Sequence, residues 1–167
     1  MLKDKIKKCL DEGKRGGERH QGLIKIKPNS DRANEHVRKA LRNFEAITDF
    51  RNTGHSDWSA SAAFYTLYHG LLAILAKKGY ESRNQSCTFA MIESLLEEKK
   101  LKELTIKDVR EIFDKDITEN LEHSTTFLDM RERMQYSILT QLQEEEFNML
   151  KERARLLLGK IRRELEN

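Results

Sequence analysis

The stretch WSASAAFYTLYHGLL, residues 58–72, decides the fold. It holds the only tryptophan of the chain, two tyrosines and a histidine, in a helical pattern rich in small residues. Five residues share one helical face: Ala62, Tyr65, His69, Leu72 and Ala76. Because the small residues let another helix approach closely, we expect this segment to be the central helix of a bundle.

The composition of the whole chain agrees with a helical bundle. A length of 167 residues predicts one domain. Charged residues make up 35% of the chain and hydrophobic residues 38%, with eight glycines and one proline, a balance that helices tolerate well. The 31 basic and 28 acidic residues are too evenly matched to indicate a nucleic-acid binder by themselves.

The segments around this central helix also follow helical spacing. Apolar residues recur at helical intervals after Pro28, and TIKD, residues 105–108, matches a capping box that starts a short helix. Further helices are expected over 29–50, 87–101, 105–113 and from 118 nearly to the end, where 144–165 form an amphipathic helix. We therefore predict an all-α, up-down helical bundle of four to five core helices.

The first 28 residues are expected to form an N-terminal arm ahead of the bundle domain, 29–167. A short helix over 2–10 is broken by the glycine-rich DEGKRGGERHQG, and LIKIKP, residues 23–28, packs as an extended segment. This arm either is a basic loop that contacts nucleic acid or is a tether. A further loop is expected at ESRNQS, residues 81–86.

The cysteines and the N-terminus predict a cytoplasmic protein. Cys9 and Cys87 are isolated and far apart, so we expect two reduced thiols in a reducing compartment. The N-terminus lacks the apolar core of a secretory signal. No run of apolar residues approaches the length of a membrane span.

His69 has two interpretations. As a core residue it would hydrogen-bond a side chain or a backbone carbonyl and stay neutral, since buried polar groups are normally paired. As a functional residue it would be a catalytic base. No histidine or carboxylate follows at the third or fourth position, so the sequence predicts no metal site and no cofactor.

Two other segments contain candidate chemistry. In RNTGH, Arg51 and His55 either bind a phosphate and move a proton or favour a helix C-terminus followed by a turn. In RERMQY, Arg131 and Gln135 share a helical face and Tyr136 lies on the adjoining one.

The residues of RERMQY would suit a phosphate or a base, with the guanidinium as clamp and the phenol as donor or stacking surface. Arg133 faces elsewhere on this helix; with Gln135 and Tyr65 it is a candidate ligand-binding residue. Alternatively, Arg131 pairs with Asp129, Glu132 or a neighbouring helix, and Tyr136 lies at the edge of the core.

Three segments together resemble the HEPN domain family: ANEHVRKALRNFEAITDF (33–50), WSASAAFYTLYHGLLAILAKKGY (58–80) and FLDMRERMQY (127–136), which precedes a long final helix. The likeness is to small archaeal and bacterial members, whose second helix resembles AYYAMFHAARALL and whose later signature resembles R..ADY. Arg131 and Tyr136 match the R and the Y of that signature, while Gln135 stands where Asp is frequent.

This resemblance implies a helical bundle that forms homodimers and has RNA- or nucleotide-related roles. Active HEPN ribonucleases carry an R-x4-6-H motif at the dimer interface, but no histidine follows Arg131, and Tyr136 takes its place. An ordinary phenol, with a pKa of about 10, is a poor base at neutral pH. His69 is then the only nearby candidate base, which makes Arg131, Tyr136 and His69 the candidate catalytic residues.

The resemblance leaves two functions open. One is a protein of a toxin–antitoxin or defence type system that binds RNA or a nucleotide and, as an enzyme, is a metal-independent endoribonuclease. The other is a catalytically silent dimeric module that serves a partner such as a minimal nucleotidyltransferase.

Overall fold

The computed structural model describes residues 1–113 and 126–167, and the chain there is mostly helical, as predicted. The prediction of helix from residue 118 falls outside the described residues until 126. The elements are α1 (Leu2–Gly16), a 3₁₀ turn η1 (Gly17–Arg19), β1 (Leu23–Lys25), α2 (Ser30–Asn52), α3 (Asp57–Lys77), β2 (Tyr80–Ser82), α4 (Gln85–Glu97), α5 (Ile106–Ile112), α6 (Phe127–Tyr136) and α7 (Glu144–Glu166).

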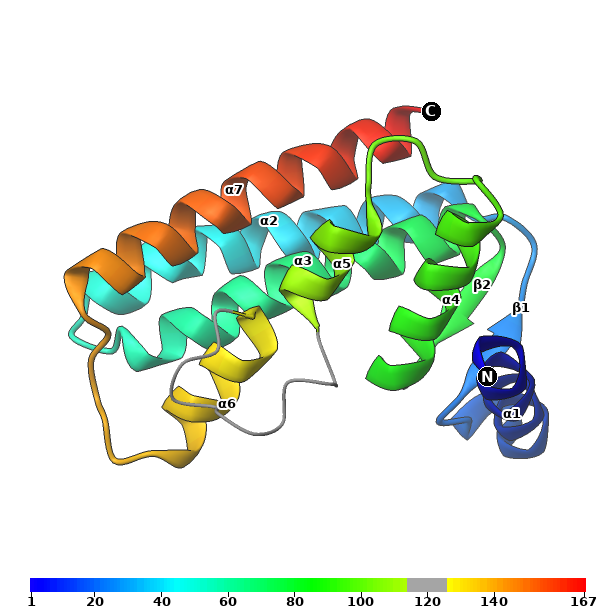
Figure 1. Ribbon diagram of the computed structural model, residues 1–167, viewed down its shortest axis with the longest axis horizontal. Helices are drawn as coiled ribbons and strands as arrows, with labels where there is room; N and C mark the ends of the chain where they lie inside the picture. Colours follow the sequence, from blue (N-terminus) through cyan, green and yellow to red (C-terminus); the bar gives the residue numbers. More distant parts are fainter. Residues whose placement is uncertain (114–125) are drawn as a thin grey trace.

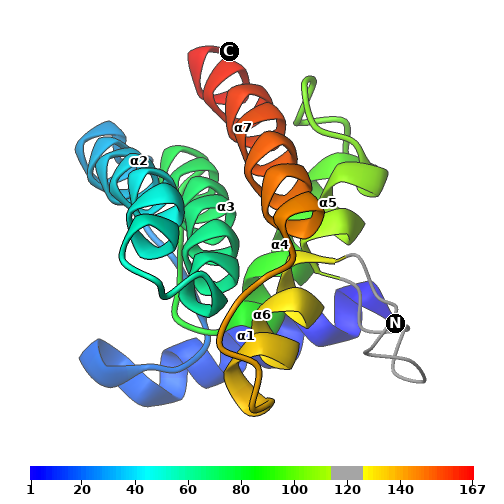
Figure 2. The same cartoon turned by 90° about the vertical axis from the view of Figure 1, so that its left-hand side faces the viewer.

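The central helix of the bundle is α3, as the sequence predicts. It runs beside α2 and α7, while α4, α5 and α6 cover its remaining sides (Figures 1 and 2). Gly70 lets α7 come close, since a Cβ there would lie 2.9 Å from Cδ1 of Ile161. By length and composition α3 could cross a membrane, but 83% of its most apolar window is buried, which is typical of a bundle's core helix.

Most positions expected to face inward do so. In α3, Ala62 and Leu72 are buried, whereas Tyr65 and His69 are only partly covered. In α7, the predicted apolar stripe is buried from Phe147 to Ile161. The capping box is present as predicted: the Thr105 side chain accepts from the Asp108 backbone, and Asp108 accepts from the Thr105 backbone at 2.9 Å.

The N-terminal arm is more ordered than the sequence predicts. The first helix does not end at residue 10 but continues to Gly16, because Gly13 serves close packing instead of breaking the helix. A Cβ on Gly13 would lie 2.1 Å from the backbone oxygen of Leu23. The predicted extended segment forms β1, which pairs antiparallel with β2. The loop expected at 81–86 is therefore wrong at both ends, since β2 runs to Ser82 and α4 begins at Gln85.

The prediction of two reduced thiols is also wrong. Cys9 of α1 and Cys87 of α4 form a disulfide, with Cα atoms 5.8 Å apart. A sequence separation of 78 hid this pairing, since the packing of α1 against α4 brings the two side chains together. The arm is thereby joined covalently to the bundle.

The continuous helix predicted toward the C-terminus is interrupted. α6 ends at Tyr136, with Ser137 in an extended conformation, and α7 begins only at Glu144. A specific contact holds the intervening segment, since the backbone N–H of Leu142 donates to the Ser56 hydroxyl at 2.8 Å. The segment therefore lies against the start of α3.

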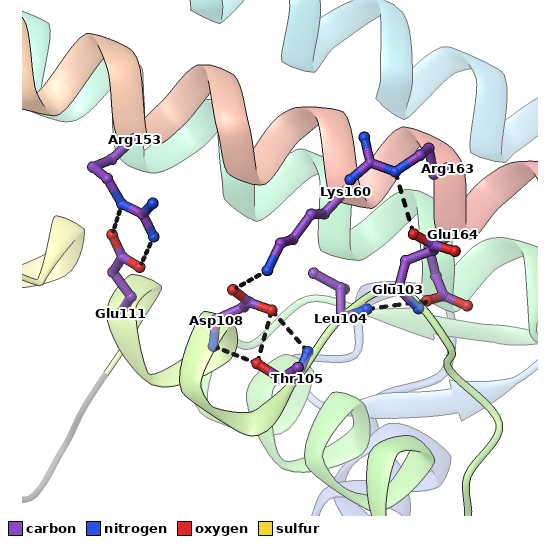
Figure 3. Close-up of polar contacts among 9 residues, drawn as sticks. All are labelled: Glu103, Leu104, Thr105, Asp108, Glu111, Arg153, Lys160, Arg163 and Glu164. Atoms are coloured by element: carbon purple, nitrogen blue, oxygen red, sulfur yellow. Dashed lines mark hydrogen bonds and ion pairs between the residues drawn. The ribbon is translucent and has the colours of Figure 1, made fainter.

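Polar contacts fasten α7 to the segment 102–112 (Figure 3). The carboxylate of Glu164, which is 2% exposed, accepts backbone N–H groups of Lys102 at 2.8 Å, Glu103 at 2.6 Å and Leu104 at 3.3 Å. We call these contacts, together with the three ion pairs below, the α5–α7 seam.

Ion pairs continue the seam along α7: Lys160 with Asp108 at 2.8 Å, Arg163 with Glu103 at 3.2 Å, and Arg153 with Glu111 (Figure 3). Burial opposes the charged form of Asp108, but hydrogen bonds from Lys160 and Thr105 outweigh it and hold the pKa of this carboxyl below its usual value. The seam is therefore an arrangement of matched charges.

Candidate functional site

Arg131 of α6 lies against aromatic groups of α3. Its Nη1 donates to the Tyr65 hydroxyl at 3.1 Å, and its Cζ lies 5.2 Å from the ring centre of Phe64 and 5.6 Å from that of Tyr65. Arginine over an aromatic ring gains cation–π attraction. Its Nε is buried, and none of the residues that the structure describes forms a hydrogen bond with it.

The charge of Arg131 is not offset by an acid. Among residues 1–113 and 126–167, no carboxylate pairs with its guanidinium. The alternative in which Asp129 or Glu132 pairs with it is therefore wrong within the described residues. A neutral hydroxyl and two rings hold the guanidinium in place, which leaves its positive charge free to meet an anion.

The other residues of the RERMQY motif are arranged differently. Gln135 is exposed, and Tyr136 is 79% exposed, so Tyr136 does not lie at the core edge. Arg133 forms an ion pair with Glu146 of α7, which already offsets its charge. Of the two arginines, Arg131 is thus the better placed for a ligand.

His69 pairs with a residue that sequence reasoning missed. Its Nδ1 lies 3.1 Å from Nδ1 of His36 on α2, and one ring donates to the other. Burial, and next the nearby His36 and Lys39, lower the pKa of His69 from 6.5 to about 4. Burial, followed by the charge of Arg32, lowers the pKa of His36 as well. Both imidazoles are therefore neutral at pH 7.

The bond to His36 takes the place of the contact that was expected between His69 and Arg131 or Tyr136. Among the residues that the structure describes, His69 makes no hydrogen bond to Arg131 or Tyr136. Tyr65, one turn earlier on α3, takes the contact with Arg131 instead. The only sequence signal for His36 was its place beside Val37 on the half-buried side of α2.

The RNTGH segment is a helix end and a turn. α2 ends at Asn52, and Gly54 adopts a φ of 79°, which favours glycine. Arg51 stacks over Phe147 at 4.4 Å and pairs with Glu144 at 3.4 Å, and exposed His55 bonds Thr53 at 3.3 Å. These contacts account for the two residues without a ligand. Within the described parts of the chain, no three metal-binding side chains cluster.

Comparison with protein families agrees with this architecture. The model of the HEPN domain matches residues 33–164. The chain belongs to the HEPN family. The match begins at Ala33 within α2, contains α3 to α6 and nearly all of α7, and leaves out the arm and its strand β1. No curated protein matches the chain.

The HEPN match covers both groups of side chains that touch the exposed half of α3. Arg131 contacts Tyr65, and His36 contacts His69 four residues further along the same helix. Residues four apart lie on one helical face. The HEPN bundle therefore places one arginine and two imidazoles along a single face of α3.

Proposed function

We propose that this HEPN protein acts in a toxin–antitoxin or defence type system and binds RNA or a nucleotide at Arg131, Gln135 and Tyr136. The observation that carries the proposal is the way Arg131 is held, by the Tyr65 hydroxyl and two rings, with no carboxylate of residues 1–113 or 126–167 paired to it. A guanidinium fixed in this way is preorganised for a phosphate.

The neighbouring side chains suit the rest of such a ligand. Tyr136 offers an exposed ring on which a base can stack, and Gln135 offers an exposed amide. Cleavage has weaker support than binding. It would need a base near Arg131, and His69 bonds His36 instead. As an enzyme, the protein would be a metal-independent endoribonuclease in which Arg131 stabilises the phosphate.

Fluorescence anisotropy with a labelled single-stranded RNA tests the proposal, with cleavage of the same RNA followed in EDTA. Arg131→Ala should weaken binding by about tenfold, the loss of one charge-assisted hydrogen bond. Arg155→Ala is the matched control, because Arg155 is exposed on α7 and paired with Glu152. Equal affinity of both variants and the wild type would refute the Arg131 site.

An exposed apolar surface favours a second candidate, a dimeric interaction module. Trp58 is 51% exposed, Ile138 98% and Leu139 54%, and Tyr136 lies beside them in sequence. The Leu142–Ser56 hydrogen bond brings these two segments to the same end of the bundle (Figure 1). Apolar groups gathered in this way are typical of protein interfaces.

In this second proposal the surface pairs with another copy or with a nucleotidyltransferase-type protein. Light scattering of the wild type and of Ile138→Glu tests it. A dimer that dissociates in Ile138→Glu supports the module. The second proposal is contradicted if the wild type is monomeric and does not bind an added nucleotidyltransferase. Lys107→Glu, on an exposed part of α5, is the control for the added charge.

A further inference from the structure

A cleft lies beside the His36–His69 pair, apart from Arg131. Its volume is about 640 Å³, and residues of α2 between Asp31 and Lys39 line it together with His69 of α3. A second cavity of about 160 Å³ shares Arg32 and His36 with it. The imidazole pair is thus accessible from a concave surface.

The hydrogen bond between His36 and His69 determines which ring nitrogens remain as a donor and as an acceptor for a ligand. One ring uses its Nδ1–H as the donor, so its Nε2 is left with a lone pair. The other ring accepts at Nδ1 and therefore carries its proton on Nε2. The neutral pair presents one donor and one acceptor; adding a proton converts both Nε2 atoms into donors.

Two cations, Arg32 and Lys39, and two acids, Asp31 and Glu35, line the cleft beside the pair. Lys39 is exposed, and no carboxylate in the described part of the chain pairs with it. Arg32 uses Nη1 for Glu81 at 2.6 Å, which leaves its other N–H groups. The carboxylate of Glu81 forms ion pairs with Arg32 and with Arg83 at 2.9 Å, and a hydrogen bond with His20 at 3.3 Å.

The remaining charged and titratable groups near the pair come from three elements. Asp31 and Glu35 of α2 are exposed at the mouth of the cleft. Tyr68 of α3 has its ring centre 6.2 Å from that of His69. At His36, Arg32 disfavours a proton, while Glu35 and then Glu81 of β2 favour one. At His69 the neighbouring His36 and Lys39 both disfavour a proton, so Arg32 and Lys39 are the cations that act on the two rings.

We propose that this cleft binds a phosphate group through Arg32, Lys39 and the two imidazoles, and that binding transfers one proton from solvent to the His36–His69 pair. The side chains of Arg32 and Lys39 beside the two rings attract an oxyanion. The bound anion in turn stabilises the imidazolium form, so proton uptake and anion binding reinforce each other. The group is either free phosphate or the phosphate of a nucleotide.

Titration with sodium sulfate, followed by NMR of the imidazole resonances, tests the site directly. Sulfate does not itself take up a proton at pH 6.5, so calorimetry in two buffers of different ionisation enthalpy counts the protons that the protein binds. We expect shifts at His36 and His69 and net proton uptake. Shifts without proton uptake would overturn the coupling, and unchanged resonances would overturn the site.

Variants separate this cleft from the Arg131 site. Lys39→Ala and His36→Gln should each weaken sulfate binding by about fivefold or more, while Lys3→Ala, an exposed lysine of α1, should not. Arg131→Ala should leave the shifts at His69 intact, so the result does not depend on the function proposed for Arg131. Equal loss in Lys39→Ala and Lys3→Ala would contradict the cleft.

Phosphate, AMP and adenosine then distinguish the sources of the anion. Phosphate and AMP of equal affinity indicate a free oxyanion site, and tighter binding of AMP indicates a nucleotide. Binding of adenosine as tight as that of AMP would overturn the role of the phosphate.

Discussion

Charged groups are arranged differently in the α5–α7 seam and on the α3 face, the partly covered side of α3 that carries Tyr65 and His69. In the seam, Lys160, Arg163 and Arg153 each meet a carboxylate, and buried Glu164 meets three backbone N–H groups. On the α3 face, Arg131 meets a phenol, and His69 meets another histidine. Both regions hold polar groups firmly, but on the α3 face no carboxylate from the described parts of the chain pairs with Arg131.

This difference separates a structural use of charge from one suited to a ligand. Paired charges in the seam fix the register of α7 on α5, and a ligand there would have to displace an internal partner. On the α3 face an anion would gain its contacts without breaking an ion pair. The comparison makes four predictions, which follow in order of decreasing size.

Glu164→Ala should lower the free energy of unfolding the most, by about 3–5 kcal/mol, since one buried and two part-buried backbone N–H groups lose their acceptor. Chemical denaturation measures the change. Glu166→Ala, an exposed residue in the same helical turn, is the control. If both variants were equally stable, the seam would not be the structural element described here.

Removing the disulfide should have the next largest effect while leaving the α3 face unchanged. Cys9→Ser together with Cys87→Ser should lower the free energy of unfolding by about 2–4 kcal/mol, because the bond closes a long loop. Denaturation with and without a reducing agent should show the same difference in the wild type. RNA affinity that fell in parallel would show that the arm supports the ligand site as well.

The Arg153–Glu111 pair should contribute little, about 0.5–1 kcal/mol, since the Arg153 side chain is 41% exposed and water screens its charge. A double-mutant cycle of Arg153→Ala and Glu111→Ala isolates this coupling. A much larger coupling would show that the seam depends on its ion pairs more than on Glu164.

Because the pKa of His69 is lowered in the folded protein, acid should cause a small loss of stability. Its pKa of about 4 lies below the unfolded value of 6.5, so the unfolded chain binds more protons as the pH falls from 6.5 toward 4. Stability should therefore decline across this window, and the decline should be shallower in His69→Gln. Thermal unfolding at pH 7, 5.5 and 4.5 measures it. If stability declined equally with pH in the wild type and in His69→Gln, His69 would not be a neutral, partly buried imidazole.

The sequence was sufficient for the bundle but not for the partners of its polar residues. Helical spacing identified α3, and the capping box identified α5, because both signals are local. The Cys9–Cys87 bond, the β1–β2 pairing and the His36–His69 contact join residues that lie far apart in the chain, and no periodicity reports such pairs.

The candidate site was predicted only in part for the same reason. The motif identified Arg131, but its contact with Tyr65, in place of an acidic partner among the described residues, depends on how α6 crosses α3. His69 was recognised as either a paired or a catalytic histidine, and its partner on α2 decided which contact it makes. The turn at RNTGH was predictable, since a glycine with positive φ ends α2 there.

The salt dependence of RNA binding tests the central claim most directly, namely that Arg131 carries an unmatched charge toward the ligand. The slope of log affinity against log salt should be smaller in Arg131→Ala than in the wild type by about 0.7, the value for one phosphate contact on a single strand. Arg153→Ala, which removes a matched charge, should keep the wild-type slope. Equal slopes for Arg131→Ala and the wild type would contradict the account.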